Sequence, residues 1–128
     1  MSKTLTIVLL REPYASQYAD IALEIAEMAL NLGYKVRLFL YMSGVHAAKR
    51  GQSPLRFPNF ERKLRELLTR GLKVIACGRC ASARGYIENS ANEEGNFSTS
   101  QYVEGVKVMS IYELADWIKN SDRVIMLG

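Results

Sequence analysis

Two kinds of hydrophobic pattern alternate along the chain, short apolar runs and longer stretches in which apolar residues recur at helical spacing. The short runs are rich in β-branched residues, which is typical of strands buried on both faces of a parallel sheet. They predict strands at residues 4–10, 34–41, 72–76, 106–109 and 124–127.

The stretches between these runs are amphipathic and predict helices at residues 16–32, 59–70, 81–87 and 111–120. Gly33 and Gly71 follow the first two, where a helix commonly ends in a left-handed residue. Ser110 is the expected N-cap of the last helix, with Glu113 as its reciprocal partner in a capping box.

Strands that alternate with helices favour a parallel sheet covered on both faces. We therefore predict an α/β fold, a single three-layer α/β/α domain over residues 1–128 with about five mostly parallel strands. The polar, glycine-containing segment at residues 88–101 is expected to be the most mobile loop.

The composition is that of an ordinary globular protein, because hydrophobic residues make up 48% and charged residues 23% of the 128 positions. A chain of this length can bury a real core as one domain. The net charge of +4 suggests mild attraction to anions. Its basic residues are scattered along the chain, so direct nucleic-acid binding is not expected.

No apolar run approaches the ~20 residues that span a bilayer, so no membrane association is expected. The first run is followed by Arg11, Glu12 and Pro13, where a signal peptide would need small residues for cleavage. A cytoplasmic location is therefore expected, in which thiols are kept reduced.

The only two cysteines, Cys77 and Cys80, directly follow the predicted strand at residues 72–76. In parallel sheets, functional sites gather at the carboxyl ends of the strands. Backbone N–H groups at a helix start, together with Arg79 and Arg84, would favour the thiolate over the thiol. We predict that Cys77 is a reactive nucleophile. The alternative is a buried structural cysteine.

Other cysteine chemistries fit this spacing less well. A dithiol redox motif usually lies near the first βαβ unit and follows an aromatic residue, whereas this pair follows the third strand and Ala76. A zinc site needs four ligands, or three and a water, whereas Cys77, Cys80 and His46 supply three at most and no second Cys-x-x-Cys pair is present. We expect no metal and, in the absence of a glycine-rich nucleotide motif, no cofactor.

His46 is the only histidine and lies beside Gly44 in a loop of small residues after the second predicted strand. The loops after parallel strands open on one edge, so His46 is expected on the same side as Cys77. It is a candidate proton donor or acceptor for the thiol. An ordinary polar loop residue is the alternative.

Several short motifs occur in a characteristic order: Pro13-Tyr14 after the first strand, Gly44-Val45 after the second, Cys77 at the end of the third with Arg84-Gly85 behind it, and a final strand after Asp122. In this order they resemble the DsrE/DsrF/TusD-like family of small sulfur-relay proteins. The resemblance implies a five-stranded, mostly parallel sheet, and subunits that assemble as trimers or hexamers. It also implies that Cys77 carries sulfur as a persulfide.

Cys80 departs from the family pattern: it could resolve the persulfide by forming a disulfide with Cys77, or be a small buried residue. The resemblance implies a sulfurtransferase-type persulfide carrier, with sulfur-donor and sulfur-acceptor proteins or small sulfane-sulfur compounds as partners. Its subunits would form homo-oligomers or hetero-oligomers with related chains. Two alternatives stay open, a dithiol–disulfide redox protein that uses Cys77 and Cys80, and a non-catalytic assembly subunit.

Overall fold

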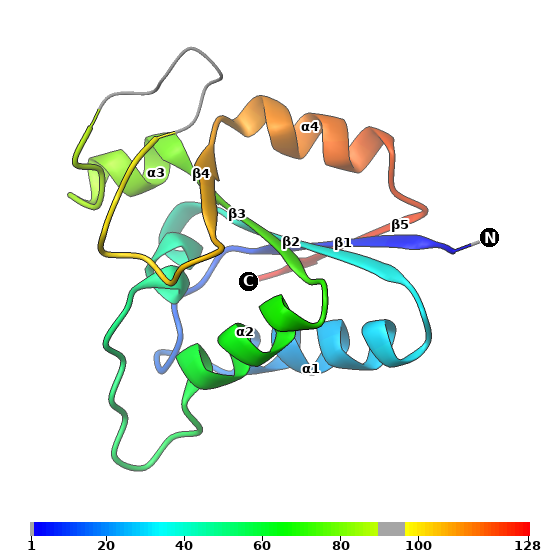
Figure 1. Cartoon of the computed structure of the whole chain (residues 1–128), viewed down its shortest axis with the longest axis horizontal. Helices are drawn as coiled ribbons and strands as arrows, with labels where there is room; N and C mark the ends of the chain where they lie inside the picture. The colour runs from blue at the N-terminus through cyan, green and yellow to red at the C-terminus, as the bar shows by residue number, and fades with distance from the viewer. Residues whose placement is uncertain (1, 90–96) are drawn as a thin grey trace.

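The computed structural model describes residues 2–89 and 97–128 (Figure 1). Within these residues the strands are β1 (Thr4–Leu9), β2 (Lys35–Leu40), β3 (Lys73–Cys77), β4 (Lys107–Met109) and β5 (Arg123–Leu127). The helices are α1 (Tyr18–Asn31), the 3-10 helix η1 (Met42–Ala48), α2 (Phe60–Thr69), α3 (Gly78–Ala83) and α4 (Ile111–Lys119).

The five strands form one sheet in the order β4-β3-β2-β1-β5, and every neighbouring pair is parallel. One row of the sheet runs through Ile125, Ile7, Leu38 and Val74. β1 and β2 lie inside the sheet, and both are fully buried toward their carboxyl ends, from Leu5 in β1 and from Leu38 in β2. The predicted parallel sheet is therefore confirmed.

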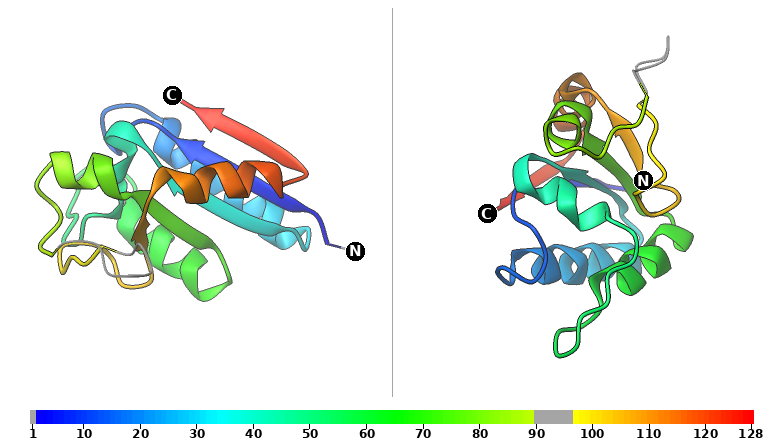
Figure 2. Two further views of the ribbon diagram at one scale, coloured as in Figure 1. Left: turned by 90° about the horizontal axis from the view of Figure 1, so that it is seen from above. Right: turned by 90° about the vertical axis from the view of Figure 1, so that its left-hand side faces the viewer.

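Helices cover both faces of the sheet, with α1 and α2 on one face and α4 on the other (Figures 1 and 2). Leu23 of α1 and Leu64 of α2 are buried in the first layer. On the opposite face Trp117 of α4 packs edge-on against Phe39 of β2, with ring centroids 6.1 Å apart. The predicted three-layer α/β/α fold is confirmed.

The ends of the helices follow the sequence signals closely. Gly33 and Gly71, which follow α1 and α2, have positive φ angles of 85° and 103°. The Ser110 hydroxyl accepts a hydrogen bond from the Tyr112 N–H at 3.3 Å and caps α4. Among the described residues the Glu113 carboxylate makes no return bond to Ser110, so only half of the capping box forms.

The short third helix was predicted at residues 81–87, and this placement is wrong. The helix α3 starts at Gly78, immediately after β3, and ends at Ala83. It cannot extend to residue 87 because Gly85 takes a φ of 84°, the left-handed conformation that ends a helix. Cys80 consequently lies inside the helix and Cys77 is its N-cap.

Two segments outside the main helices and strands bear on the candidate site, the one after β2 and the one at residues 88–101. The small-residue segment after β2 forms the 3-10 helix η1. Half of the loop predicted at residues 88–101 to be mobile, residues 90–96, lies outside the described residues. On either side of that gap, Asn89 pairs with Ser98, and Phe97 pairs with Val108 of β4.

Candidate functional site

The loops that follow β2 and β3 meet at the carboxyl edge of the sheet. The Met42 N–H, at the start of η1, donates a hydrogen bond to the Cys80 sulfur at 3.3 Å. Gly44 lies against the end of β1, where a Cβ atom would come within 2.1 Å of the Leu9 carbonyl oxygen. Only glycine allows this approach, which holds η1 beside the cysteine-bearing helix.

Cys77 is the last residue of β3 and the N-cap of α3. Its side chain is 2% exposed and belongs to the hydrophobic core. The sulfur makes no capping hydrogen bond to the helix N–H groups. The sequence therefore located the cysteine correctly at the edge of the sheet, but the thiol lies inside the protein.

Cys80 is 9% exposed and lies beside Cys77. Burial raises the pKa of the Cys80 thiol, and the Cys77 sulfur raises it further. The Met42 N–H and the charge of Arg84 act in the opposite direction without cancelling this rise. Cys80 is consequently a neutral thiol near pH 7, and it can donate its proton to a neighbouring sulfur.

The two candidate arginines differ in position. Arg84 donates a hydrogen bond from Nη1 to the Cys80 carbonyl oxygen at 3.1 Å, and its charge lowers the pKa of Cys80. Arg79 is exposed, and within residues 2–89 and 97–128 it has no hydrogen bond or salt bridge. Arg79 is thus a residue of α3 whose side chain lies at the surface, whereas the Arg84 side chain folds back on the carbonyl of Cys80.

His46 lies in η1 on the predicted side of the sheet, but its partner is a tyrosine. Its Nδ1 is 2.6 Å from the Tyr86 hydroxyl oxygen, and the two rings meet edge to face with centroids 5.4 Å apart. Tyr86 in turn packs on Tyr102, with centroids 4.9 Å apart. His46 therefore joins a row of three rings rather than bonding directly to a thiol.

Tyr102 is a residue of this site that the sequence analysis missed. Its phenol oxygen is the one buried side-chain oxygen or nitrogen of the described residues without a hydrogen-bond partner. Burial raises the pKa of the Tyr102 phenol, and Tyr86 raises it further. Charge on Cys80 or Cys77 also raises the pKa of this phenol, whereas Arg84 lowers it. Tyr102 is joined to the cysteine-bearing helix through Tyr86, whose backbone N–H donates to the Ala81 carbonyl oxygen at 3.0 Å.

Phe97 covers the start of α3. Its ring lies over Gly78, where a Cβ atom would come within 2.3 Å of the ring. The Phe97 N–H donates to the Val108 carbonyl oxygen at 3.0 Å, which holds the ring beside β4. A glycine directly after Cys77 therefore leaves room for an aromatic cover over this part of the site.

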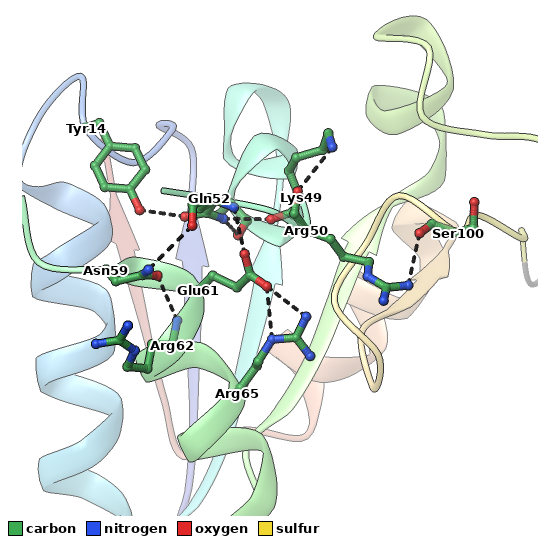
Figure 3. A network of polar contacts seen from close by, with 10 residues as sticks. Tyr14, Lys49, Arg50, Gln52, Asn59, Glu61, Arg62, Arg65 and Ser100 are labelled. Atoms are coloured by element: carbon green, nitrogen blue, oxygen red, sulfur yellow. Dashed lines mark hydrogen bonds and ion pairs between the residues drawn. The ribbon is translucent and has the colours of Figure 1, made fainter. Parts of the chain in front are cut away.

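A separate polar network joins the segment after η1 to the start of α2 (Figure 3). The Tyr14 hydroxyl donates to Gln52 Oε1 at 2.7 Å, and the Gln52 N–H donates to Glu61 Oε1 at 2.8 Å. Arg65 also donates to Glu61, at 2.7 Å. A cavity of about 540 Å³ adjoins this network. Phe57 is among the residues that line it, and no cysteine is.

The described part of the chain has no cluster of three or more histidine, cysteine or acidic side chains that could hold a metal ion. No helix among the described residues is long and apolar enough to cross a membrane. The described residues bring two thiols, the His46 imidazole, the phenols of Tyr86 and Tyr102 and the Arg84 guanidinium to the carboxyl edge.

The model of the DsrE/DsrF-like family matches residues 3–127 of the chain. The chain belongs to the DsrE/DsrF-like family. An uncharacterized protein of Methanopyrus kandleri is 36% identical over 121 residues, which cover 94% of this chain and 91% of that protein. The alignment with this relative therefore covers nearly the whole domain.

Protein YchN of Escherichia coli is 30% identical over 115 residues, which cover 88% of this chain and 89% of that protein. The crystal structure of YchN is similar with a TM-score of 0.75 and 26% sequence identity. This similarity covers 98% of the present chain and 99% of the YchN chain. The DsrE/DsrF-like fold of the domain is thus shared from end to end.

Proposed function

We propose that this DsrE/DsrF-like protein is a persulfide carrier in which Cys77 accepts sulfane sulfur and passes it on. The observation that carries the proposal is the position of Cys77 at the carboxyl end of β3, with a second thiol beside it. The chain belongs to the DsrE/DsrF-like family, and its motifs resemble those of small sulfur-relay proteins, which supports the same proposal.

Sulfur transfer to Cys77 is a displacement at sulfur. The Cys77 thiolate attacks a sulfane sulfur of the donor, so that one S–S bond forms on Cys77 while one S–S bond of the donor breaks. The rest of the donor leaves as a thiolate or a shorter polysulfide, and the outer sulfur on Cys77 carries the negative charge. An acceptor thiolate reverses these steps, and no external oxidant is consumed.

Burial of the site favours the storage step of a relay. Cys77 is 2% exposed, so a persulfide there is separated from thiols in solution. A small inorganic polysulfide reaches a buried thiol more easily than a cysteine on the surface of a folded donor protein does. Transfer to a partner protein therefore requires the carboxyl edge of the sheet to open. Arg84 contributes a positive charge near the thiol pair, which favours anionic sulfur.

A dithiol–disulfide redox protein is the second candidate, favoured by the interaction between the two thiols. Here Cys80 attacks the inner sulfur of the Cys77 persulfide, a Cys77–Cys80 disulfide forms, and the outer sulfur leaves as hydrosulfide with the Cys80 proton. The persulfide is reduced and the two cysteines are oxidised, so the electrons balance. A separate reductant, a dithiol, would then regenerate the pair.

Intact-protein mass spectrometry after incubation with inorganic polysulfide distinguishes these functions. Wild type and Cys80→Ser are expected to gain a thiol-reversible sulfur atom, whereas Cys77→Ser gains none. The Cys80→Ser variant tests the relay directly, because a carrier needs only the thiol of Cys77 whereas a dithiol reductase needs both.

A Cys77–Cys80 disulfide formed in place of any sulfur adduct would favour the redox protein. A chain that takes up no sulfur and forms no disulfide would be a non-catalytic assembly subunit. Equal uptake by Cys77→Ser and wild type would contradict the role of Cys77 as the carrier.

We also propose a reducing, cytoplasmic setting, in keeping with two cysteines that are both free. The proposed partners are proteins or small compounds that donate or accept sulfane sulfur. Association of subunits into a trimer or hexamer, or with related chains, remains part of the proposal.

A further inference from the structure

One hydroxyl group inside the protein has no hydrogen-bond partner. The Tyr102 side chain is 3% exposed, and its oxygen is the unpaired buried polar atom of the described side chains. Leaving a hydroxyl unpaired in a protein interior is costly, and such groups are rare in native proteins. An unpaired donor of this kind indicates a partner that arrives with a ligand.

The backbone around Tyr102 is well fixed. The Val103 N–H donates to the Ala48 carbonyl oxygen at 2.7 Å, and Tyr102 itself pairs with Lys49 at the end of η1. The ring packs on Tyr86, with centroids 4.9 Å apart. Backbone pairing and ring packing together hold the phenol in one place.

The phenol lies in the same buried region as the thiol pair. Tyr102 packs on Tyr86, whose backbone N–H donates to the Ala81 carbonyl oxygen of α3 at 3.0 Å. The 3-10 helix η1 contacts the thiol pair as well, because the Met42 N–H at its start donates to the Cys80 sulfur at 3.3 Å. The unpaired hydroxyl and both thiols therefore belong to one buried cluster.

We propose that the Tyr102 hydroxyl donates a hydrogen bond to the outer, anionic sulfur of a persulfide on Cys77. This inference rests on the proposed carrier function and extends it by assigning the group that holds the cargo. The ligand class is a single sulfane sulfur with negative charge, because Cys77 and Tyr102 are both almost fully buried.

The protonation state of the phenol fits this role. Burial raises the pKa of Tyr102 well above its usual value, so the group stays an O–H donor throughout the neutral range. A hydrogen bond from a neutral donor to an anion is stronger than one between neutral groups. In the empty carrier the hydroxyl is unpaired, and in the loaded carrier it is satisfied.

The test compares Tyr102→Phe with Tyr14→Phe. Each variant removes one tyrosine hydroxyl, but that of Tyr14 is already bonded to Gln52 at 2.7 Å and to the Phe60 N–H at 3.2 Å, away from the cysteines. Each protein is loaded with inorganic polysulfide, separated from excess reagent and exposed to a small thiol. Mass spectrometry then follows loss of the added sulfur, and thermal unfolding is measured on the unloaded proteins.

We expect one variant to change sulfur retention and the other to change the melting temperature. Tyr102→Phe should lose its sulfur at least about tenfold faster than wild type, because a hydrogen bond to a charged group is gone, while its melting temperature does not fall. Absorbance of the persulfide anion should appear at higher pH in this variant. Tyr14→Phe should keep its sulfur as wild type does and melt about 3 °C lower.

Two results would overturn this inference alone. One is equal sulfur retention by Tyr102→Phe and wild type. The other is a melting temperature of Tyr102→Phe that falls as in Tyr14→Phe, or a failure to fold, since the hydroxyl would then have a partner in the empty protein. If wild type takes up no sulfur, the carrier function itself fails and this inference fails with it.

Discussion

Gly78 and Phe97 form the cover of the thiol site. The Phe97 ring occupies the space that a side chain at position 78 would fill, as the 2.3 Å approach of a Cβ atom there demonstrates. Cys77 is the neighbouring residue and is almost fully buried. A reagent in solution therefore reaches this thiol only when the local structure opens.

Replacing the cover should expose the thiol. In Phe97→Ala, alkylation of Cys77 by iodoacetamide is expected to become about tenfold faster, because removing a partly buried ring lowers the free energy of local opening. Peptide mass spectrometry at timed intervals measures the rate. Phe57→Ala is the matched control, since Phe57 is exposed and lies outside the thiol site. Equal rates in both variants and wild type would show that the ring of Phe97 is no barrier.

At the residue scale, the sequence predicted the positions that follow a strand but not their partners. Cys77 was expected at the carboxyl end of its strand and lies there. The partner of His46 is Tyr86, forty positions later, and nothing in local spacing indicates that bond. Tyr102 reaches the site through its pairing with Lys49, a tertiary contact that no sequence motif marks.

At the scale of elements, Glu61 joins the segment after η1 to the first turn of α2 (Figure 3). Burial raises the pKa of the Glu61 carboxyl, but hydrogen bonds from Arg65 and from the Gln52 N–H outweigh it. The pKa of this carboxyl is therefore below its usual value. The ionised side chain thus joins the two elements, together with the hydrogen bond that the Asn59 side chain donates to the Gln52 carbonyl oxygen at 3.4 Å.

Removing this charge should weaken the fold in a pH-dependent way. A group with a lowered pKa stabilises the folded state above its ordinary range, and that contribution is lost as the pH falls through the folded pKa. At pH 7, Glu61→Gln is expected to lower the free energy of unfolding by about 1.5 kcal/mol. The difference from wild type should shrink below about pH 4.

Denaturant unfolding at a series of pH values measures this effect. Glu66→Gln on the same helix is the control, because Glu66 is exposed and its carboxylate bonds to no described side chain. A deficit in Glu61→Gln that stays constant from pH 7 to acid, or one that Glu66→Gln shares, would contradict the role of the Glu61 charge.

Among the elements, strands were easier to predict than the short helix. The run in β1 is buried on both faces from Leu5 onward and that in β2 from Leu38 onward, which favours a strand inside a parallel sheet. In contrast, α3 has six residues and begins with Gly78, a poor helix former. Its start is fixed by the turn from β3 and by the Phe97 ring above it, and both are tertiary effects.

For the whole molecule, the strand order leaves β5 at one edge of the sheet beside β1. An edge strand has unpaired backbone groups on one side and can pair with another chain. Met126 of β5 is 61% exposed, and Val124 is also exposed. This edge is the surface through which we expect two copies of the chain to associate.

A charge on this strand should weaken association. Met126→Lys is expected to shift the protein toward monomer in sedimentation velocity, because a lysine on an edge strand opposes pairing. Met28→Lys is the matched control, since Met28 on α1 is 60% exposed. A monomeric wild type, or an equal shift in both variants, would contradict association through β5.

The burial of Cys77 has a kinetic consequence for a carrier. An acceptor in solution reacts only with molecules whose carboxyl edge is momentarily open. Raising the acceptor concentration speeds delivery until every opening event is used, and beyond that point the opening rate sets the pace. Sulfur delivery would then saturate with acceptor even where no acceptor complex forms, and the plateau would report the motion of the protein rather than an affinity.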